Sequence, residues 1–147
     1  MNIYLDACCL NRLTDDQSQH RIRVEAEAVE LILGKIRTGE VRWVSSEALS
    51  DEINRNPQLE RRLENTALLN LATETIEVDS QIAERARNLR DVGYGAFDAL
   101  HIACAESARV DVLLTTDDAF IRRALRGDGS PGVRIANPLS WSQRTLS

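Results

Sequence analysis

Two acidic residues follow apolar runs at positions where a carboxylate can take part in chemistry. Asp6 comes directly after the apolar run 3–5, and Asp117 comes shortly after the mostly apolar segment 110–114. Short apolar runs of this kind are typical of buried strands, and in a parallel sheet ligands bind at the carboxyl edge. We therefore expect these two carboxylates to point toward the same edge of a sheet.

Two further acids lie on predicted helices. In a helix over 47–55, Glu52 falls on the apolar side, whereas Glu47 and Asp51 turn away from it. Asp98 lies near the start of a helix over 97–108 that is apolar on most sides. A buried ionised carboxylate is costly without a partner, so Asp98 needs a counter-charge.

Taken singly, each of these acids is most simply a helix cap or a dipole complement. Four inward-facing acids near one edge, however, would raise one another's pKa values unless a cation neutralised them. Lys35 is the only lysine in the chain, and no buried arginine is evident. Carboxylate ligation suits Mg²⁺ or Mn²⁺, which position and activate water for attack on phosphates. The four acids together predict a divalent metal site.

The elements that would position these acids alternate between strand and helix, which predicts an α/β fold. A mainly parallel sheet of about five strands, covered on both faces, follows from connections long enough for crossovers. The strands are expected over 3–5, 41–45, 75–78, 110–114 and 133–136, and the helices over 22–36, 47–55, 59–72, 79–92, 97–108 and 118–125. A polar loop is expected after Asp6 and a short tail after 136. We expect one domain over 1–147.

Composition limits the possible classes of protein. With 43% hydrophobic residues in a chain of 147, a disordered protein is excluded. The apolar stretch 96–105 is shorter than the roughly 18 residues of a membrane span, and no secretory signal precedes the first strand, so a cytoplasmic location is expected. The formal charge of −5 means that a nucleic-acid partner needs local arginines or a bridging metal.

Four segments carry a resemblance to a known family. They are IYLDAC at 3–8, SEALSDE at 46–52, FDALHIACA at 97–105 and LLTTDDAF at 113–120. With these segments the chain resembles PIN-domain ribonucleases, in particular the VapC-like toxin of VapBC-type toxin–antitoxin pairs. The resemblance implies a three-layer α/β/α PIN-like fold over most of the chain.

The resemblance also implies a function and a site. The family's metal-binding acids correspond to Asp6, Glu52, Asp98 and Asp117, with Thr116 and Asp118 as helpers beside the last acid. It implies a metal-dependent endoribonuclease that uses Mg²⁺ or Mn²⁺ on single-stranded or loop RNA. It further implies a cognate antitoxin that blocks the acidic pocket, and a homodimer. The chain departs from the family at Ala7 and Cys8, where small hydroxyl residues are often found.

Other candidate sites are weaker. A zinc set of Cys8, Cys9, Cys104 and His101 lacks any C-x-x-C pair. His101 has two interpretations, a hydrogen bond to Asp98 or a place in the core, of which the core is favoured. Arg12 is a candidate contact for RNA phosphate, with Arg122, Arg123 and Arg126 as further possibilities. The rival function is a non-catalytic PIN-fold scaffold or RNA-binding protein.

Overall fold

The centre of the molecule is a five-stranded parallel sheet. The computed structural model describes residues 1–146, and Ser147, the last residue of the predicted domain, lies outside them. The strands are β1 (Asn2–Leu5), β2 (Arg42–Ser46), β3 (Glu74–Ile76), β4 (Val112–Leu114) and β5 (Arg134–Ala136). Their order is β3-β2-β1-β4-β5, and every neighbouring pair is parallel. The predicted sheet is confirmed.

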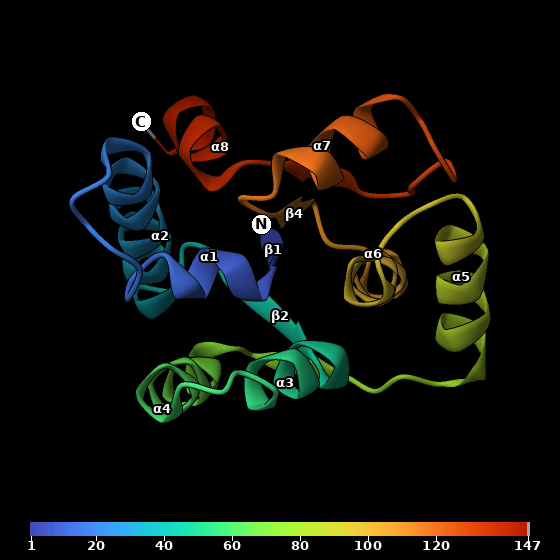
Figure 1. Ribbon diagram of the computed structural model, residues 1–147, viewed down its shortest axis with the longest axis horizontal. Helices are drawn as coiled ribbons and strands as arrows, with labels where there is room; N and C mark the ends of the chain where they lie inside the picture. The colour runs from blue at the N-terminus through green and yellow to red at the C-terminus, as the bar shows by residue number, and fades with distance from the viewer. Residues whose placement is uncertain (147) are drawn as a thin grey trace.

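Helices cover both faces of this sheet (Figure 1). On one side α2 (His20–Arg37) packs against α8 (Pro138–Thr145), and on the other α5 (Ser80–Asp91) packs against α6 (Ala96–Ala108). The remaining helices are α1 (Ala7–Asn11), α3 (Glu47–Asn54), α4 (Leu59–Leu68), the 3₁₀ turn η1 (Leu69–Leu71) and α7 (Asp118–Leu125). The three-layer α/β/α fold is therefore confirmed.

The strand order places a switch point between β1 and β4. From β1 the chain adds β2 and β3 in one direction, whereas β4 lies on the other side of β1 and is followed by β5. Connections that leave neighbouring strands in opposite directions open a crevice at the carboxyl edge. The Asp6 N–H donates to the Leu114 carbonyl at 2.9 Å, so the segments after β1 and β4 start side by side.

The core explains why the central strands are apolar without alternation. Ile3, Tyr4 and Leu5 of β1 and Leu113 and Leu114 of β4 are fully buried. Strands covered by helices on both faces contact apolar atoms through every side chain. None of the helices in residues 1–146 combines the length and apolar composition that crossing a membrane requires.

Two short helices were not predicted. The segment after Asp6, expected to be a polar loop, begins with α1, which is five residues long and too short to show a helical period. The C-terminal tail contains α8, which the Asn137 side chain caps by accepting the Leu139 N–H. Asparagine followed by proline at the first helical position is a recognised start signal, so Asn137 and Pro138 were informative.

Candidate active site

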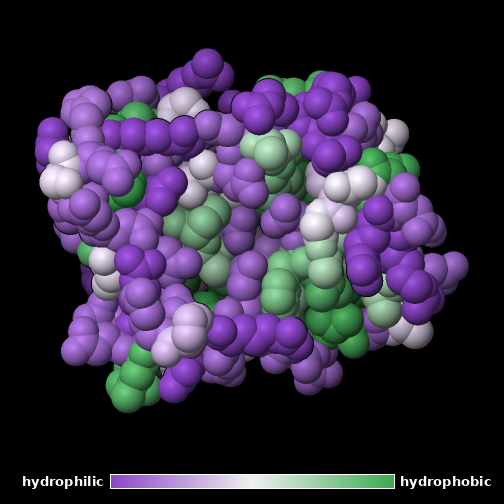
Figure 2. Space-filling model, viewed as in Figure 1, coloured by the Kyte–Doolittle hydropathy of each residue, from purple (hydrophilic) through white to green (hydrophobic). Residues whose placement is uncertain are grey.

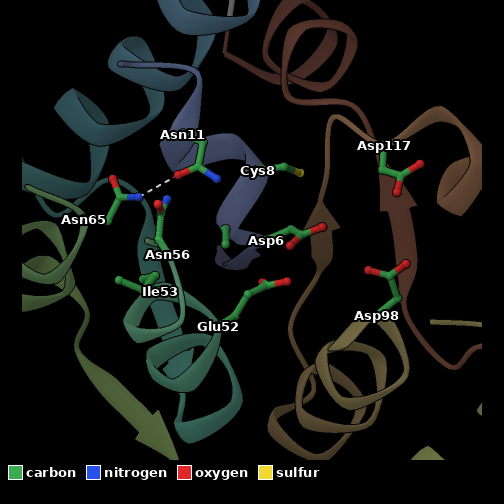
Figure 3. Close-up of a pocket in the computed structure, with 10 residues that line it drawn as sticks. Asp6, Cys8, Asn11, Glu52, Ile53, Asn56, Asn65, Asp98 and Asp117 are labelled. Atoms are coloured by element: carbon green, nitrogen blue, oxygen red, sulfur yellow. Dashed lines mark hydrogen bonds between the residues drawn. The ribbon is translucent and has the colours of Figure 1, made fainter. Parts of the chain in front are cut away.

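One pocket at the carboxyl edge of the sheet brings the four predicted acids together. The cavity has a volume of about 200 Å³, and its lining includes Asp6, Glu52, Asp98 and Asp117. These acids come from the end of β1, from α3, from the first turn of α6 and from the start of α7. Figure 3 shows Asp6 and Glu52 facing Asp98 and Asp117 across the pocket. Hydrophilic side chains predominate on this face of the molecule and extend into its centre (Figure 2).

The Asp6 side chain points into the pocket and does not cap the helix that follows it. Asp6 occupies the N-cap position of α1, yet its side chain accepts no hydrogen bond from the helix. Instead, its Oδ2 accepts a hydrogen bond from Thr115 Oγ1 at 2.8 Å. The same hydroxyl accepts the Asp117 N–H at 3.2 Å, so Thr115 links the two strand-end acids. Asp6 as a whole residue is only 4% exposed, although its carboxylate points into a cavity.

Glu52 is oriented by a buried histidine. Glu52 faces inward, as its helical phase predicted. The Ser46 hydroxyl accepts the Leu49 N–H, caps α3 and thereby fixes the residue at which the helix begins. Glu52 Oε1 lies 2.9 Å from His101 Nε2. The neighbouring acid Glu47 instead accepts the Val78 N–H outside the pocket.

His101 is a buried neighbour of these acids, and its contacts with Asp6 and Glu52 were not predicted. It is fully buried, its Nε2 lies 3.6 Å from Asp6 Oδ1, and its Nδ1 lies 2.6 Å from the Tyr4 hydroxyl. Burial lowers the pKa of His101, but the hydrogen bond to Glu52 and the nearby carboxylates outweigh it, so the pKa is raised. The core interpretation of His101 was therefore incomplete, because this core residue also contacts the acids. Its place one helical turn after Asp98 was the available signal.

The two remaining acids, Asp98 and Asp117, differ in the hydrogen bonds that they accept. Asp98 accepts no hydrogen bond from residues 1–146, and its pKa is raised to about 7 by burial and then by the charge of Asp6, while His101 opposes the shift. Asp117 caps α7, since its Oδ1 accepts the N–H groups of Ala119 and Phe120. Its Oδ2 has no partner among the described residues, so capping and pocket lining coexist in Asp117.

The donor set fits a divalent cation. Ligand atoms of Asp6, Glu52 and His101 lie within 4.8 Å of one another. His101 Nε2 is already hydrogen-bonded to Glu52, which leaves carboxylate oxygens as the ligands, and oxygen ligands suit Mg²⁺ and Mn²⁺. Burial raises the pKa of Asp98, and the neighbouring carboxylates add a repulsion that raises it further. A cation of charge two would relieve it.

Comparison with known proteins identifies the family. The family model of the PIN domain matches residues 3–125. The chain belongs to the PIN-domain family. Proteins of this family are generally nucleases, and all four acids of the pocket fall within the matched residues.

Solved structures share the fold of this PIN domain. A chain of VapBC2 from Rickettsia felis, bound to a DNA fragment from its promoter, is 14% identical with a TM-score of 0.60, over 93% of this chain and 98% of the other. A chain of DNA-bound VapBC from Salmonella typhimurium is 19% identical with a TM-score of 0.57, over 94% and 98%. No match was found among curated proteins. At these identities the likeness concerns the fold.

The predicted helper residues of the PIN domain lie beside the pocket rather than in it. Asp118 makes an ion pair with Arg21, with oxygen-to-nitrogen distances of 2.6 and 2.8 Å, and neither Asp118 nor Thr116 is among the pocket-lining residues. The Thr116 carbonyl accepts a hydrogen bond from the same arginine. The hydroxyl that contacts an acid belongs to Thr115, which the sequence could not distinguish from its neighbour because both follow the same strand.

Arg12 is engaged with acids inside the PIN domain. Its Nε donates to Glu25 Oε1 at 2.9 Å and its Nη1 donates to Asp15 Oδ2 at 2.8 Å. Glu25 is 2% exposed and also accepts from Arg21 and Asn137, so it joins α1, α2 and the segment after β5. Arg12 therefore has a structural partner, and its contact with RNA phosphate stays a prediction. Glu25 was missed, although it lies three residues after Ile22 on the apolar face of α2.

Proposed function

We propose that this chain is a metal-dependent endoribonuclease, the toxin of a toxin–antitoxin pair. One observation carries the proposal. Carboxylates from positions 6, 52, 98 and 117 converge on one pocket at the switch point of the sheet, where the buried His101 contacts two of them. In the proposal the four acids hold Mg²⁺ or Mn²⁺ and the substrate is an RNA phosphodiester. A single PIN-like domain over 1–147, acting in the cytoplasm, is part of the same proposal.

The contacts of three of the acids support their proposed roles. Thr115 fixes the Asp6 carboxylate through a hydroxyl that donates to it, and His101 fixes Glu52 in the same way. Within residues 1–146 no group donates a hydrogen bond to Asp98, so both of its oxygens are available to a ligand. When bound, a divalent ion supplies positive charge to a phosphate and makes water more acidic. The chain's contribution is to hold four oxygen ligands in place before the ion and the RNA arrive.

The proposed partners are a cognate antitoxin and a second copy of the chain. Two solved structures that share this fold come from VapBC complexes, which supports an antitoxin partner, and in the proposal that partner blocks the acidic pocket. A homodimer is supported by leucines on α4 that face solvent: the exposed fractions are 56% for Leu59 and 59% for Leu63. Leu68, Leu69 and Leu71 of the same region pack on the core instead.

The test is cleavage of a mixed set of labelled RNAs by the purified chain with Mn²⁺, Mg²⁺ or EDTA. We expect cleavage that requires the metal and is abolished by Asp98→Asn. Asp51→Asn is the matched control, because Asp51 is an exposed acid on α3 directly before Glu52 and does not line the pocket. Equal activity of the wild type and Asp98→Asn would refute the assignment of the site.

The rival function, a non-catalytic scaffold or RNA-binding protein, makes a different prediction. It expects no cleavage of any RNA in the set, and Mn²⁺ titration by calorimetry then shows no binding that depends on Asp98, or binding without turnover. Four mutually repelling carboxylates in a partly buried pocket favour the enzyme, because without a cation they cost stability.

A further inference from the structure

The pocket has a second wall, made of amides. Asn11 at the end of α1, Asn56 after α3 and Asn65 on α4 line the same cavity as the four acids. Figure 3 shows these three side chains beside one another, across the pocket from Asp98 and Asp117. We call Asn11, Asn56 and Asn65 the amide wall. Among the residues that line the pocket in the described chain, none is basic.

Two amides of this wall have their oxygens fixed by partners, which determines where their nitrogens point. Asn56 Oδ1 accepts the Gln58 N–H at 2.9 Å, and Asn11 Oδ1 accepts from Asn65 Nδ2 at 2.8 Å. Neither the Asn11 nor the Asn56 amide nitrogen has an acceptor within residues 1–146. In Figure 3 the Asn11 nitrogen lies on the side away from Asn65. The wall thus offers two oriented, neutral hydrogen-bond donors.

Asn65 is buried, and among the described residues its side chain hydrogen-bonds only to Asn11. Its side chain is 2% exposed, and its buried Oδ1 has no hydrogen-bond donor among the described residues. A buried unpaired oxygen lowers stability, and a leucine, which has the same branched shape, would avoid that loss. The one hydrogen bond that the Asn65 side chain makes is the one that orients Asn11. Asn65 is therefore a positioning residue, and the group that it positions faces the pocket.

We propose that the amide wall binds the nucleoside next to the phosphate held at the acids. This inference rests on the proposed function and adds a determinant of selectivity to it. Amide nitrogens donate to neutral acceptors, and a nucleoside carries such acceptors on its base edge and in its 2′-hydroxyl. Because the lining lacks basic groups, the wall suits these neutral groups better than a second phosphate. Asn11 and Asn56 make the contacts, and Asn65 holds Asn11.

The test measures binding rather than cleavage. Eight fluorescein-labelled pentanucleotides, each of the four bases in ribo and deoxy form, are titrated by anisotropy against the Asp98→Asn chain in Mg²⁺. We expect at least a tenfold preference for one base or for ribose, in line with the energy of good amide contacts. Adding Asn11→Ala or Asn65→Leu should reduce the preference to within about twofold. Asn54→Ala is the matched control, because Asn54 is an exposed asparagine at the end of α3.

The outcomes separate the two acceptor sources. If the wall variants abolish preference among bases, the wall contacts the base edge, and if they abolish preference for ribose over deoxyribose, it contacts the 2′-hydroxyl. Equal binding of all eight probes, or a preference that the wall variants leave unchanged, overturns the inference. Asn65→Leu should melt at the same temperature as its parent or higher. If Asn65→Leu does not fold, Asn11→Ala decides, because Asn11 is only half-buried.

The inference and the proposed function fail in different ways. Metal-dependent cleavage by the wild type with no loss of preference in the wall variants refutes the inference alone. A preference that depends on the wall, in a chain whose wild type cleaves no RNA, refutes the proposed catalysis alone.

Discussion

Replacing Asp98 by asparagine should make the metal-free protein more stable, although the same change should abolish activity. Asp98 is half-buried, accepts no hydrogen bond from residues 1–146 and faces the charges of Asp6, Asp117 and Glu52. Asparagine has nearly the same shape and no charge. The substitution therefore removes the cost of burying a charge and the repulsion from its neighbours, but it removes no hydrogen bond.

The magnitude follows from the pKa of Asp98, which folding raises from 3.8 to about 7. The folded state holds this proton more tightly than the unfolded chain, so stability of the wild type falls as the pH rises from about 4 to about 7. At about 1.4 kcal/mol for each pKa unit, the full effect is about 4 kcal/mol, and it grows by about 2 to 3 kcal/mol between pH 5 and pH 8. Partial exposure of the carboxyl makes these upper values.

The assay is urea unfolding of wild type and Asp98→Asn in EDTA at pH 5 and pH 8. We expect the variant to have a higher free energy of unfolding than the wild type, and we expect this difference to be larger at pH 8 than at pH 5. Mn²⁺ should then raise the stability of the wild type more than that of the variant, because a ligand stabilises the state that binds it. A variant that is less stable at pH 8, or a difference that does not depend on pH, would refute the reasoning.

Three further predictions concern the stability of regions outside the pocket. Arg12→Ala should lower the free energy of unfolding in urea by about 2 kcal/mol, because it removes one partner of the buried Glu25 carboxylate. A loss below about 0.5 kcal/mol, which is usual for a surface substitution, would contradict this prediction. Ser46→Ala should cost about 1 to 2 kcal/mol, because α3 loses its cap, with reduced helical signal at high temperature as the check. Gly93→Ala should destabilise the protein by more than about 1 kcal/mol, because the φ of Gly93 is +113° and the added Cβ would meet an arginine of α7. Gly34→Ala should instead stabilise the protein by up to about 1 kcal/mol, because Gly34 lies within helix α2 and the added Cβ would meet no other atom. Equal shifts in melting temperature for the two variants would show the reasoning to be wrong.

Much of the site's framework was predictable because it depends on local patterns. Apolar runs that end on Asp6 and precede Asp117 indicate strands that carry acids at one edge, and parallel strands place those ends together. The helical phase that turns Glu52 inward and Asp51 outward depends only on 100° per residue. Asp79 and Ser46 directly precede α5 and α3, and each caps its helix by accepting a backbone N–H group, as polar residues at that position commonly do.

What was missed depends on neighbours that are distant in the chain. His101 on an apolar helix is equally compatible with packing or with a site, and only its contacts with Glu52 and Tyr4 show that it does both. Thr115 and Thr116 have the same chemistry, and the direction of the strand end decides which hydroxyl meets Asp6. The partnership of Asn11 with Asn65 spans 54 positions and leaves no periodic signal.

The sequence by itself determined the α/β order, the parallel sheet and the four acids, because hydrophobic periodicity and strand direction act over a few residues. Only the tertiary structure decided how those acids are satisfied: which hydroxyl binds Asp6, which imidazole balances Glu52, and why Asp98 is left without a donor. The reason is physical. Burial and the distances between charged groups set hydrogen bonding and pKa, and both are properties of the assembled core rather than of any segment.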